Sequence, residues 1–364
     1  MIKLRRFFDS IYFYILLPVL CMLAFGWLIS FLKIPFVFVP SPDTGTPIIL
    51  EKLADEYSYA LLPFSYQSDH SFVESTPQII QTPQDTQTPE QEEEQAAKPI
   101  PEGALPIKTL TVTPASYMKG IDGVFVKNDA QKDFSLQQMI DNDVQLGLKK
   151  NVEEPQVLIV HTHATETYNN ENLEYYLPNK SYRSDDNAIN MVHIGDIIDT
   201  ILTNAGYKVI HTNTHHDIDF NKSYTSSYNE ISSYLEKYPS IKVVLDVHRD
   251  TIITNDGVKY RTVTEINGQQ SSQVMMLMGC GNDTYKHPNW DKNFTLACHI
   301  QKKAAELYPN LMRPILLRDA RYNEHLTTGS LLVEVGTCGN TPQEAELGAK
   351  LFADVLVKVL DESK

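Results

Sequence analysis

The sequence predicts an α/β fold in which a mostly parallel β-sheet is covered by helices on both faces. Between residues 155 and 364, short apolar runs typical of buried strands alternate with longer segments whose apolar residues recur at helical spacing. Several of the apolar runs end in polar residues, as the strands of a buried parallel sheet do. With 42% hydrophobic and 21% charged residues, the composition is that of a globular protein. Alternation of strands and helices in such a chain favours a sheet with a helical layer on each side.

The individual elements follow from these patterns. Short apolar runs predict strands at residues 157–163, 207–214, 241–250, 274–279 and 330–336. Helical periodicity predicts helices at residues 187–204, 223–238, 293–308 and 341–360. The last helix begins with Thr341 as its N-cap and has Glu344 three positions later, which is the pattern of a capping box.

The N-terminal segment predicts a membrane anchor. Residues 10–32 contain no charged side chain, and about 20 apolar residues suffice to cross a bilayer. Lys3, Arg5 and Arg6 precede this run, so the positive-inside rule makes residues 1–9 cytoplasmic and the rest of the chain extracytoplasmic. The alternative is a cleaved signal peptide, but no small-residue cleavage site follows the run. We therefore expect an uncleaved transmembrane helix.

The segment after the anchor predicts a stalk. Residues 33–105 are expected to form an extracytoplasmic linker, of which residues 76–105 are rich in Pro, Gln and Glu and poor in apolar residues. Such a composition cannot bury enough surface to offset the entropy lost on ordering, so disorder is expected there. Residues 106–154, with two strand-like runs and one helix-like run, are the predicted N-terminal part of the folded region, and residues 155–364 are the predicted main domain.

The charge of the chain argues against nucleic-acid binding, and its cysteine content argues against a cysteine-ligated zinc site. The chain has 31 Lys+Arg against 46 Asp+Glu, a formal net charge of −15. Nucleic-acid binding needs a basic surface, so we expect no nucleic-acid partner. Four cysteines without a CxxC pair make a cysteine-ligated zinc site improbable.

Polar side chains follow three predicted strands at the point where each strand ends. His161 and His163 follow the first strand, His248 lies at the end of the third, and Glu334 lies in the last. Because ligands bind beyond the carboxyl ends of parallel strands, we expect these residues to meet at one edge of the sheet. Two histidines and a carboxylate can hold a catalytic zinc ion, and a separate carboxylate can act as general base.

The sequence resembles a known family in four segments, QVLIVHTHATETY, NMVHIGDII, LDVHRD and GSLLVEVGTCGNTPQEAE. These are similar to the engulfment peptidoglycan hydrolases of endospore-forming bacteria, the stage II sporulation protein P family. The catalytic domain of that family is similar to the amidase_3-type zinc N-acetylmuramoyl-L-alanine amidases. The resemblance covers roughly residues 106–360, and it implies an amidase_3-like fold with a zinc amidase domain at residues 155–364.

The resemblance implies three zinc ligands. His163 takes the place of the family's first histidine, although Thr162 replaces the glycine that usually precedes it. His248, in DVHRD, takes the place of the second histidine. Asp186 takes the place of a glutamate and is one methylene shorter, so Asp185 and Glu166 remain alternatives for the carboxylate ligand.

The resemblance also implies a general base and substrate contacts. Glu334, in LLVEVGTCGN, takes the place of the family's catalytic glutamate, and its apolar neighbours favour a functional role because a buried carboxylate is costly otherwise. From its residue type, Arg249 either pairs with Asp250 or binds a peptide carboxylate, and Asn323, in a segment that resembles the family's, is a weaker candidate for contacting substrate. His215 and His216 lie in a polar loop and are expected to be solvated.

The implied activity is hydrolysis of the amide bond that joins N-acetylmuramic acid to L-alanine, with Zn²⁺ as cofactor and stem-peptide cross-links as further substrates. The implied setting is the mother-cell membrane during engulfment, with the domain facing the septal space and with stage II sporulation proteins D and M as partners. A catalytically inactive wall-binding scaffold that recruits another hydrolase is the main alternative. A zinc carboxypeptidase is a third, for which only Arg249 suggests a carboxylate clamp.

Overall fold

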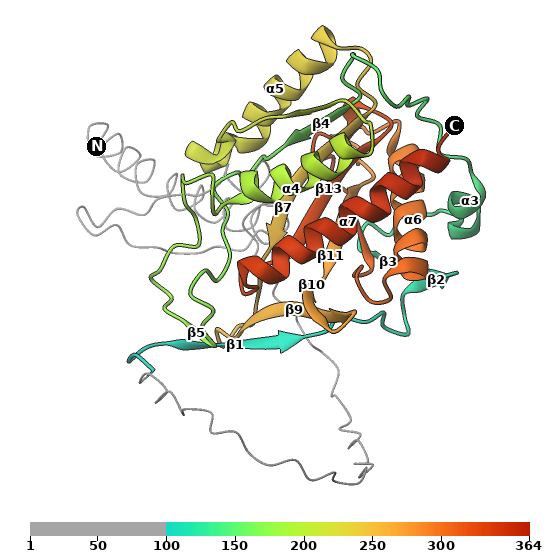
Figure 1. Cartoon of the computed structure of the whole chain (residues 1–364). Coiled ribbons are helices and arrows are strands. Elements are labelled where there is room, and N and C mark those ends of the chain that lie inside the picture. The colour runs from blue at the N-terminus through green and yellow to red at the C-terminus, as the bar shows by residue number, and fades with distance from the viewer. Residues whose placement is uncertain (1–99) are drawn as a thin grey trace, which may run out of the picture. The chain divides into compact units, whose positions relative to one another are not determined.

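The computed structural model describes residues 100–364 (Figure 1). The predicted cytoplasmic residues 1–9, the predicted anchor at 10–32 and most of the predicted stalk lie outside the described residues. Between residues 100 and 364, no helix combines the length and the apolar character needed to cross a membrane. The anchor therefore stays a prediction from the sequence.

The main element of the fold is an eight-stranded sheet. In spatial order its strands are β2 (Lys119–Ile121), β3 (Val124–Asn128), β12 (Ile315–Arg318), β11 (Val274–Gly279), β13 (Ser330–Thr337), β7 (Val243–Asp250), β4 (Val157–Val160) and β6 (Val209–His211). The pairs β12–β3, β11–β12, β13–β7, β4–β7 and β4–β6 are parallel, whereas β2–β3 and β11–β13 are antiparallel. The prediction of a mostly parallel sheet is confirmed, and the reversal between β11 and β13 was not predicted.

The parallel half of the sheet, β13-β7-β4-β6, positions the candidate site. Since β4, β7 and β13 run in one direction, their carboxyl ends reach the same edge. Glu334 of β13 is the register partner of His248 of β7, and the chain leaving β4 reaches His163 three residues later. Residues far apart in sequence thus meet where the pattern of strand ends predicts.

Helices cover both faces of this sheet, as predicted. They are α3 (Leu136–Asp141), α4 (Met191–Asn204), α5 (Ser223–Lys237), α6 (Trp290–Leu307) and α7 (Pro342–Glu362). The larger apolar cluster joins α3, α4, α6 and α7 to one face, and Figure 1 shows α4 and α7 crossing in front of the strands. On the other face, Ile231 of α5 packs with Leu158 and Val244. Successive residues along a strand therefore pack against opposite helical layers.

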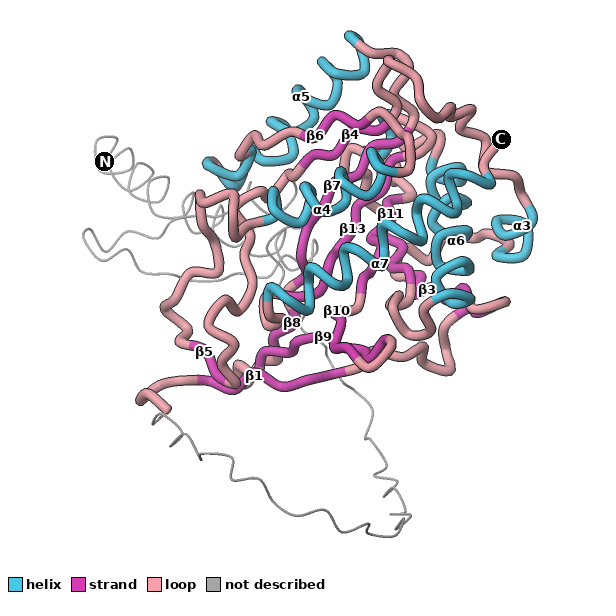
Figure 2. Tube along the Cα trace, viewed as in Figure 1, coloured by secondary structure: helices cyan, strands magenta, loops and turns pink. Residues whose placement is uncertain are grey.

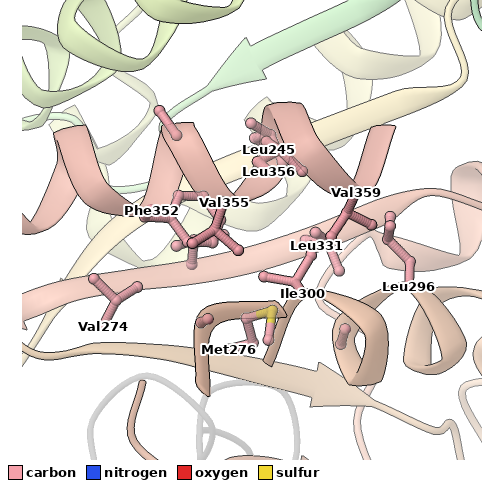
Figure 3. Close-up of a cluster of buried hydrophobic side chains, with 14 of the residues drawn as sticks. Leu245, Val274, Met276, Leu296, Ile300, Leu331, Phe352, Val355, Leu356 and Val359 are labelled. Carbon is pink, nitrogen blue, oxygen red and sulfur yellow. The ribbon is translucent and has the colours of Figure 1, made fainter. Parts of the chain in front are cut away.

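The C-terminal helix supplies much of the core. Phe352, Val355, Leu356 and Val359 of α7 lie against side chains of the central strands and of α6 (Figure 3). The capping box at its start is present as predicted, because the Thr341 hydroxyl accepts a hydrogen bond from the Glu344 backbone N–H and the Glu344 carboxylate accepts one from the Thr341 N–H. Its defined start fixes how the helix lies over the sheet.

A second sheet was not predicted. Its strands are β10 (Gln269–Ser272), β9 (Lys259–Ile266), β1 (Leu105–Leu110) and β5 (Tyr175–Tyr176), with β8 (Ile252–Ile253) paired to β9 (Figure 2). β1 runs parallel to β9 and antiparallel to β5. Residues 106–154 thus contribute to both sheets, since β1 belongs to this one and β3 pairs with β12 in the main one.

Candidate metal centre

Three side chains form a buried group with the character of a metal site. His163, Glu166 and His248 each offer a ligand atom, and these atoms lie within 4.8 Å of one another. His163 Nδ1 lies 3.9 Å from Glu166 Oε1, and His248 Nδ1 lies 3.8 Å from Glu166 Oε2. Two imidazoles and a carboxylate form a ligand set that catalytic zinc uses, with a fourth position left for water. The residues present therefore fit zinc.

Ser223 selects the nitrogen of His163 that is available to a metal. The Ser223 hydroxyl donates to the carbonyl oxygen of Phe220 at 2.9 Å and lies 3.1 Å from His163 Nε2. With that hydroxyl hydrogen directed at Phe220, the serine oxygen is free to accept a hydrogen bond from a protonated Nε2. Nδ1 then keeps its lone pair and faces Glu166. Orientation of a ligating imidazole by a hydrogen bond to its other nitrogen is usual in metal sites.

Asp246 has the corresponding place beside His248. His248 Nε2 lies 2.9 Å from Asp246 Oδ1, so its Nδ1 is the nitrogen that faces the group. The aspartate also accepts hydrogen bonds from the backbone N–H and the hydroxyl of Thr162. Burial alone would lower the pKa of His248, but the negative charge of Asp246 and contact with it raise that pKa to about 9. A metal ion binding at Nδ1 would therefore have to displace a proton.

The other two members of the group have pKa values suited to ligation. Burial lowers the pKa of His163 to about 4, so this imidazole is neutral at pH 7. Burial alone would raise the pKa of Glu166, but the positive charge of Arg249 and the neighbouring histidines hold it below its ordinary value. Glu166 is therefore an anion at neutral pH.

Glu334 lies beside this group with one oxygen unused. Its Oε2 is buried and has no hydrogen-bond partner among the described residues. Burial, followed by the negative charge of Asp250, raises the pKa of Glu334 to about 8. Asp250 is itself held by Arg313, whose Nη1 lies 2.7 Å away. A buried carboxyl with a raised pKa and a free oxygen is the kind of group that accepts and returns protons in catalysis.

The structure brings together His163, His248 and Glu166, and it places Asp186 elsewhere. Glu166 lies in the turn that follows β4, where its N–H donates to the carbonyl oxygen of His163. Asp186 is exposed, and its carboxylate accepts a hydrogen bond from the Ala188 N–H. Asp185 is also exposed. The carboxylate of the group is thus Glu166, the alternative that lies nearest to His163 in sequence.

Arg249 is turned into the protein. It is 8% exposed, and it donates to the carbonyl oxygens of Thr167 and Tyr182 and to the hydroxyl of Thr251. Its backbone N–H also lies 3.3 Å from Glu166 Oε2. The guanidinium therefore stabilises the loop beside Glu166, and these bonds do not leave it facing a substrate.

Asn323 connects two elements near the centre. Its side-chain amide donates to the carbonyl oxygen of Tyr224 and to the hydroxyl of Ser227, both on α5. Asn323 and the preceding Tyr322 both have positive φ angles, +60° and +44°. The Tyr224 ring in turn meets His163 edge-on, with 5.7 Å between ring centroids. Asn323 thus holds the start of α5 against the site.

A short segment before α5 covers His163, and the sequence did not reveal it. Phe220, in the 3₁₀ turn Phe220–Lys222, stacks on the His163 ring at 4.8 Å and 10°. The Arg183 guanidinium lies 4.9 Å from the centre of the Phe220 ring and forms an ion pair with Asp217 at 2.6 Å. This cover removes His163 from water and accounts for much of its burial.

Asp246 and Ser223 orient His248 and His163, and only Asp246 could have been predicted from the sequence. Asp246 lies two positions before His248 on the same strand, so the two side chains share a face. Ser223 is 60 residues from His163 and has no local signal, because only the packing of α5 brings it there.

A sheet edge that gathers two histidines and a carboxylate beside a buried glutamate defines an α/β protein with a group of side chains that could hold a metal ion. The comparison with family models is more specific. The chain belongs to the stage II sporulation protein P (SpoIIP) family, whose model matches residues 55–357. The resemblance stated from the sequence is thereby confirmed.

Individual relatives agree with the family. Stage II sporulation protein P of Bacillus subtilis is 26% identical over 216 residues, which are 55% of this chain and 49% of that protein. The chain thus spans about half the length of that relative.

Among solved structures, N-acetylmuramoyl-L-alanine amidase AmiC2 of Nostoc punctiforme is 13% identical in sequence to this chain, with a TM-score of 0.34. The alignment covers 57% of this chain and 97% of the amidase chain. The CwlD amidase from Clostridioides difficile, solved with the GerS lipoprotein, is 12% identical with a TM-score of 0.35, and covers 57% of this chain and 96% of its own. TM-scores of this size are too low to establish a shared fold.

Proposed function

We propose that this protein is a zinc-dependent peptidoglycan hydrolase that cleaves the amide bond between N-acetylmuramic acid and L-alanine. The same centre would hydrolyse stem-peptide cross-links, since both reactions are amide hydrolysis. The observation that supports the proposal best is the buried group of His163, Glu166 and His248 with the unpaired oxygen of Glu334 beside it. Membership of the SpoIIP family supports a role in sporulation.

The residues divide the chemistry between them. His163 and His248 through Nδ1, and Glu166 through its carboxylate, would hold the zinc ion. When bound, zinc supplies a Lewis acid that polarises the scissile carbonyl and makes water a better nucleophile at neutral pH. The positive charge of a bound metal ion would favour the ionised form of Glu334, whose carboxylate then accepts the proton of the attacking water and donates it to the leaving amine nitrogen of L-alanine. Phe220 and Arg183 exclude bulk water from the His163 side of the centre.

The proposed setting follows from the family and from the sequence. Residues 10–32 would anchor the chain in the mother-cell membrane, with the hydrolase domain on the extracytoplasmic side facing the septal peptidoglycan. Stage II sporulation proteins D and M are the proposed partners. The carboxypeptidase alternative loses its support, because the Arg249 donors already bind Thr167, Tyr182 and Thr251.

The test measures metal and products together on the full-length chain. We expect the purified protein to hold about one zinc ion and to release peptides with a free L-alanine amino end from purified peptidoglycan, as read by mass spectrometry. His163→Ala and His248→Ala should lose the metal. Glu334→Gln should keep the metal and lose about 10²–10⁴-fold in rate, because only the proton acceptor is removed.

His299→Ala is the matched control, because His299 bonds the carbonyl oxygen of Asn142 away from the centre. This variant should keep both metal and activity. If the wild type binds wall without metal or cleavage, the inactive scaffold becomes the better description.

A further inference from the structure

His161 is buried beside the metal centre, and the hydrolysis described so far gives it no part. It is 0% exposed and directly follows β4, two positions before His163. Its Nδ1 lies 2.9 Å from the carbonyl oxygen of Val247, the residue that precedes His248 on β7. One imidazole therefore joins the segment that carries one proposed ligand to the strand that carries the other.

The other nitrogen of His161 contacts a second histidine. His161 Nε2 lies 2.8 Å from Nε2 of His211, the last residue of β6. On its far side, His211 Nδ1 lies 3.1 Å from Oδ1 of Asp196, which belongs to α4. The end of β4 is thus held to β7 through one nitrogen of His161 and to β6 and α4 through the other.

The partners of His161 determine where its hydrogen lies. A carbonyl oxygen only accepts, so Nδ1 bears a hydrogen and donates it to Val247. The two nitrogens face a carbonyl oxygen and a second imidazole, and the ring is fully buried, which together favour its neutral form. His161 Nε2 then accepts a hydrogen bond from His211 Nε2. Because both nitrogens are used, His161 is not itself a metal ligand.

Helix α4 approaches this pair closely because residue 195 is a glycine. A Cβ atom at Gly195 would overlap His211 Nε2 and would lie 2.6 Å from His161 Nε2. Gly195 lies inside α4, where glycine is less favourable than alanine. Two apolar side chains would fill the same space without needing hydrogen-bond partners, but they would not bind the Val247 carbonyl. The close approach therefore preserves a polar connection that packing alone does not require.

We propose that His161 is a positioning residue for the metal centre, and that its bonds to Val247 and His211 set the separation of His163 and His248. The inference rests on the proposed function, since it assumes that His163 and His248 bind zinc. The side chains described above orient each ligand ring separately, whereas His161 fixes the backbone of one ligand relative to that of the other. Losing its bonds would weaken the centre without removing a ligand.

The experiment compares two replacements of His161 in the full-length chain. His161→Asn keeps a side-chain N–H near the place of Nδ1, whereas His161→Leu has none. We expect His161→Leu to bind zinc about 10–100-fold more weakly, as measured by chelator competition, and His161→Asn to regain most of that affinity. The visible spectrum of the Co²⁺-loaded protein should change in His161→Leu and return to that of the wild type in His161→Asn. A general loss of packing would not produce this rescue.

A second measurement needs no metal. In metal-free protein labelled with ¹⁵N-histidine, we expect His161 to carry its hydrogen on Nδ1, with the signal assigned by its loss in His161→Asn. Gly195→Ala, which forces a methyl group against both rings, should disturb this signal and weaken zinc binding although every ligand is kept. His193→Gln is the matched control on the same helix, because His193 pairs with Glu346 instead, and it should match the wild type in both measurements.

The outcomes separate the inference from the proposed function. A hydrogen on His161 Nε2, or equal zinc affinities for His161→Leu and the wild type, would overturn the positioning role. If the wild type also cleaves wall peptides in that case, the proposed function stands alone. If zinc affinity and the cobalt spectrum follow the expected order but nothing is cleaved, the positioning role stands and the hydrolase is refuted. A wild type that binds no zinc refutes both.

Discussion

Ser223 belongs to no sequence motif, yet its hydroxyl decides which nitrogen of His163 faces Glu166. Without that hydroxyl, His163 could protonate Nδ1 and rotate away from the metal. We expect Ser223→Ala to bind zinc about 10–100-fold more weakly, the usual cost of removing a partner that orients a ligand. Competition with a chromogenic chelator measures this affinity. Thr225→Ala, which removes an exposed hydroxyl from the same turn of α5, should leave it unchanged, and equal affinities for the two variants would contradict the assigned role.

The sequence pattern predicted which side chains would lie close together where they come near the ends of strands. His163 follows β4, and His248 and Glu334 lie near the carboxyl ends of β7 and β13, so their proximity could be expected from the strand pattern. The preference for Asp186 over Glu166 could not be resolved from sequence, because it depends on a hydrogen-bonded turn after β4.

The expected solvation of a neighbouring polar loop was wrong for His216. That side chain is 4% exposed and lies 2.8 Å from both Ser226 Oγ and Glu230 Oε2. Polar partners on α5 compensate its burial, and a local sequence pattern contains no information about them.

At the scale of elements, α7 is the helix whose start can be tested most directly. The Thr341 hydroxyl accepts from the Glu344 N–H, and the Glu344 carboxylate also accepts from the Asn340 side-chain amide. We expect Thr341→Ala to lower the free energy of unfolding by about 1 kcal/mol, because an N-terminal N–H loses its partner. Urea denaturation monitored by circular dichroism measures the change. Thr200→Ala, the same replacement on an exposed turn inside α4, should cost less, and equal losses would show that the cap is unimportant.

Helices and buried strands with a clear apolar pattern could be predicted from the sequence. Strand direction and the pairing of strands that are distant in the sequence could not. The helices α4, α5, α6 and α7 and the strands β4, β7, β11 and β13 all match predicted segments. The direction of β11 relative to β13 could not be read from its apolar run, because a buried run looks the same whichever way it is oriented. β9 and β10 alternate polar and apolar residues only weakly, and the pairing of β9 with β1 joins segments that are far apart in the sequence.

For the whole molecule, the buried histidines predict a limit on stability at acid pH. Burial lowers the pKa of His287 to about 4, with further lowering from His325 and Arg321, and burial and Arg321 lower that of His325 to about 4. A folded pKa below the unfolded value of about 6.5 means that the unfolded state binds protons first. Their contribution to stability is therefore complete above about pH 6.5 and is lost as the pH falls toward 4.

This pH dependence can be measured by denaturant titrations between pH 7.5 and 4.5. His325→Phe should reduce the slope of unfolding free energy against pH in that window, because one proton-binding group is gone from the unfolded state. His299→Phe, which alters a histidine on the outer side of α6, should keep the wild-type slope. A slope that is the same in all three proteins would assign the acid sensitivity to other groups.

The second sheet gives β1 a mechanical consequence. β1 is the first strand of the described chain, and Ile107 to Leu110 lie in parallel register with Lys259 to Thr262 of β9. A force pulling on the chain from its N-terminal side would act along this strand and load the β1–β9 hydrogen bonds in shear, all at once, instead of opening them one after another. Leu105 and Pro106 also pair with Tyr176 and Tyr175, so the same pull would reach the segment that follows Glu166 in the chain. A few backbone hydrogen bonds would thus carry tension from the N-terminal side of the chain into the segment between Glu166 and α4.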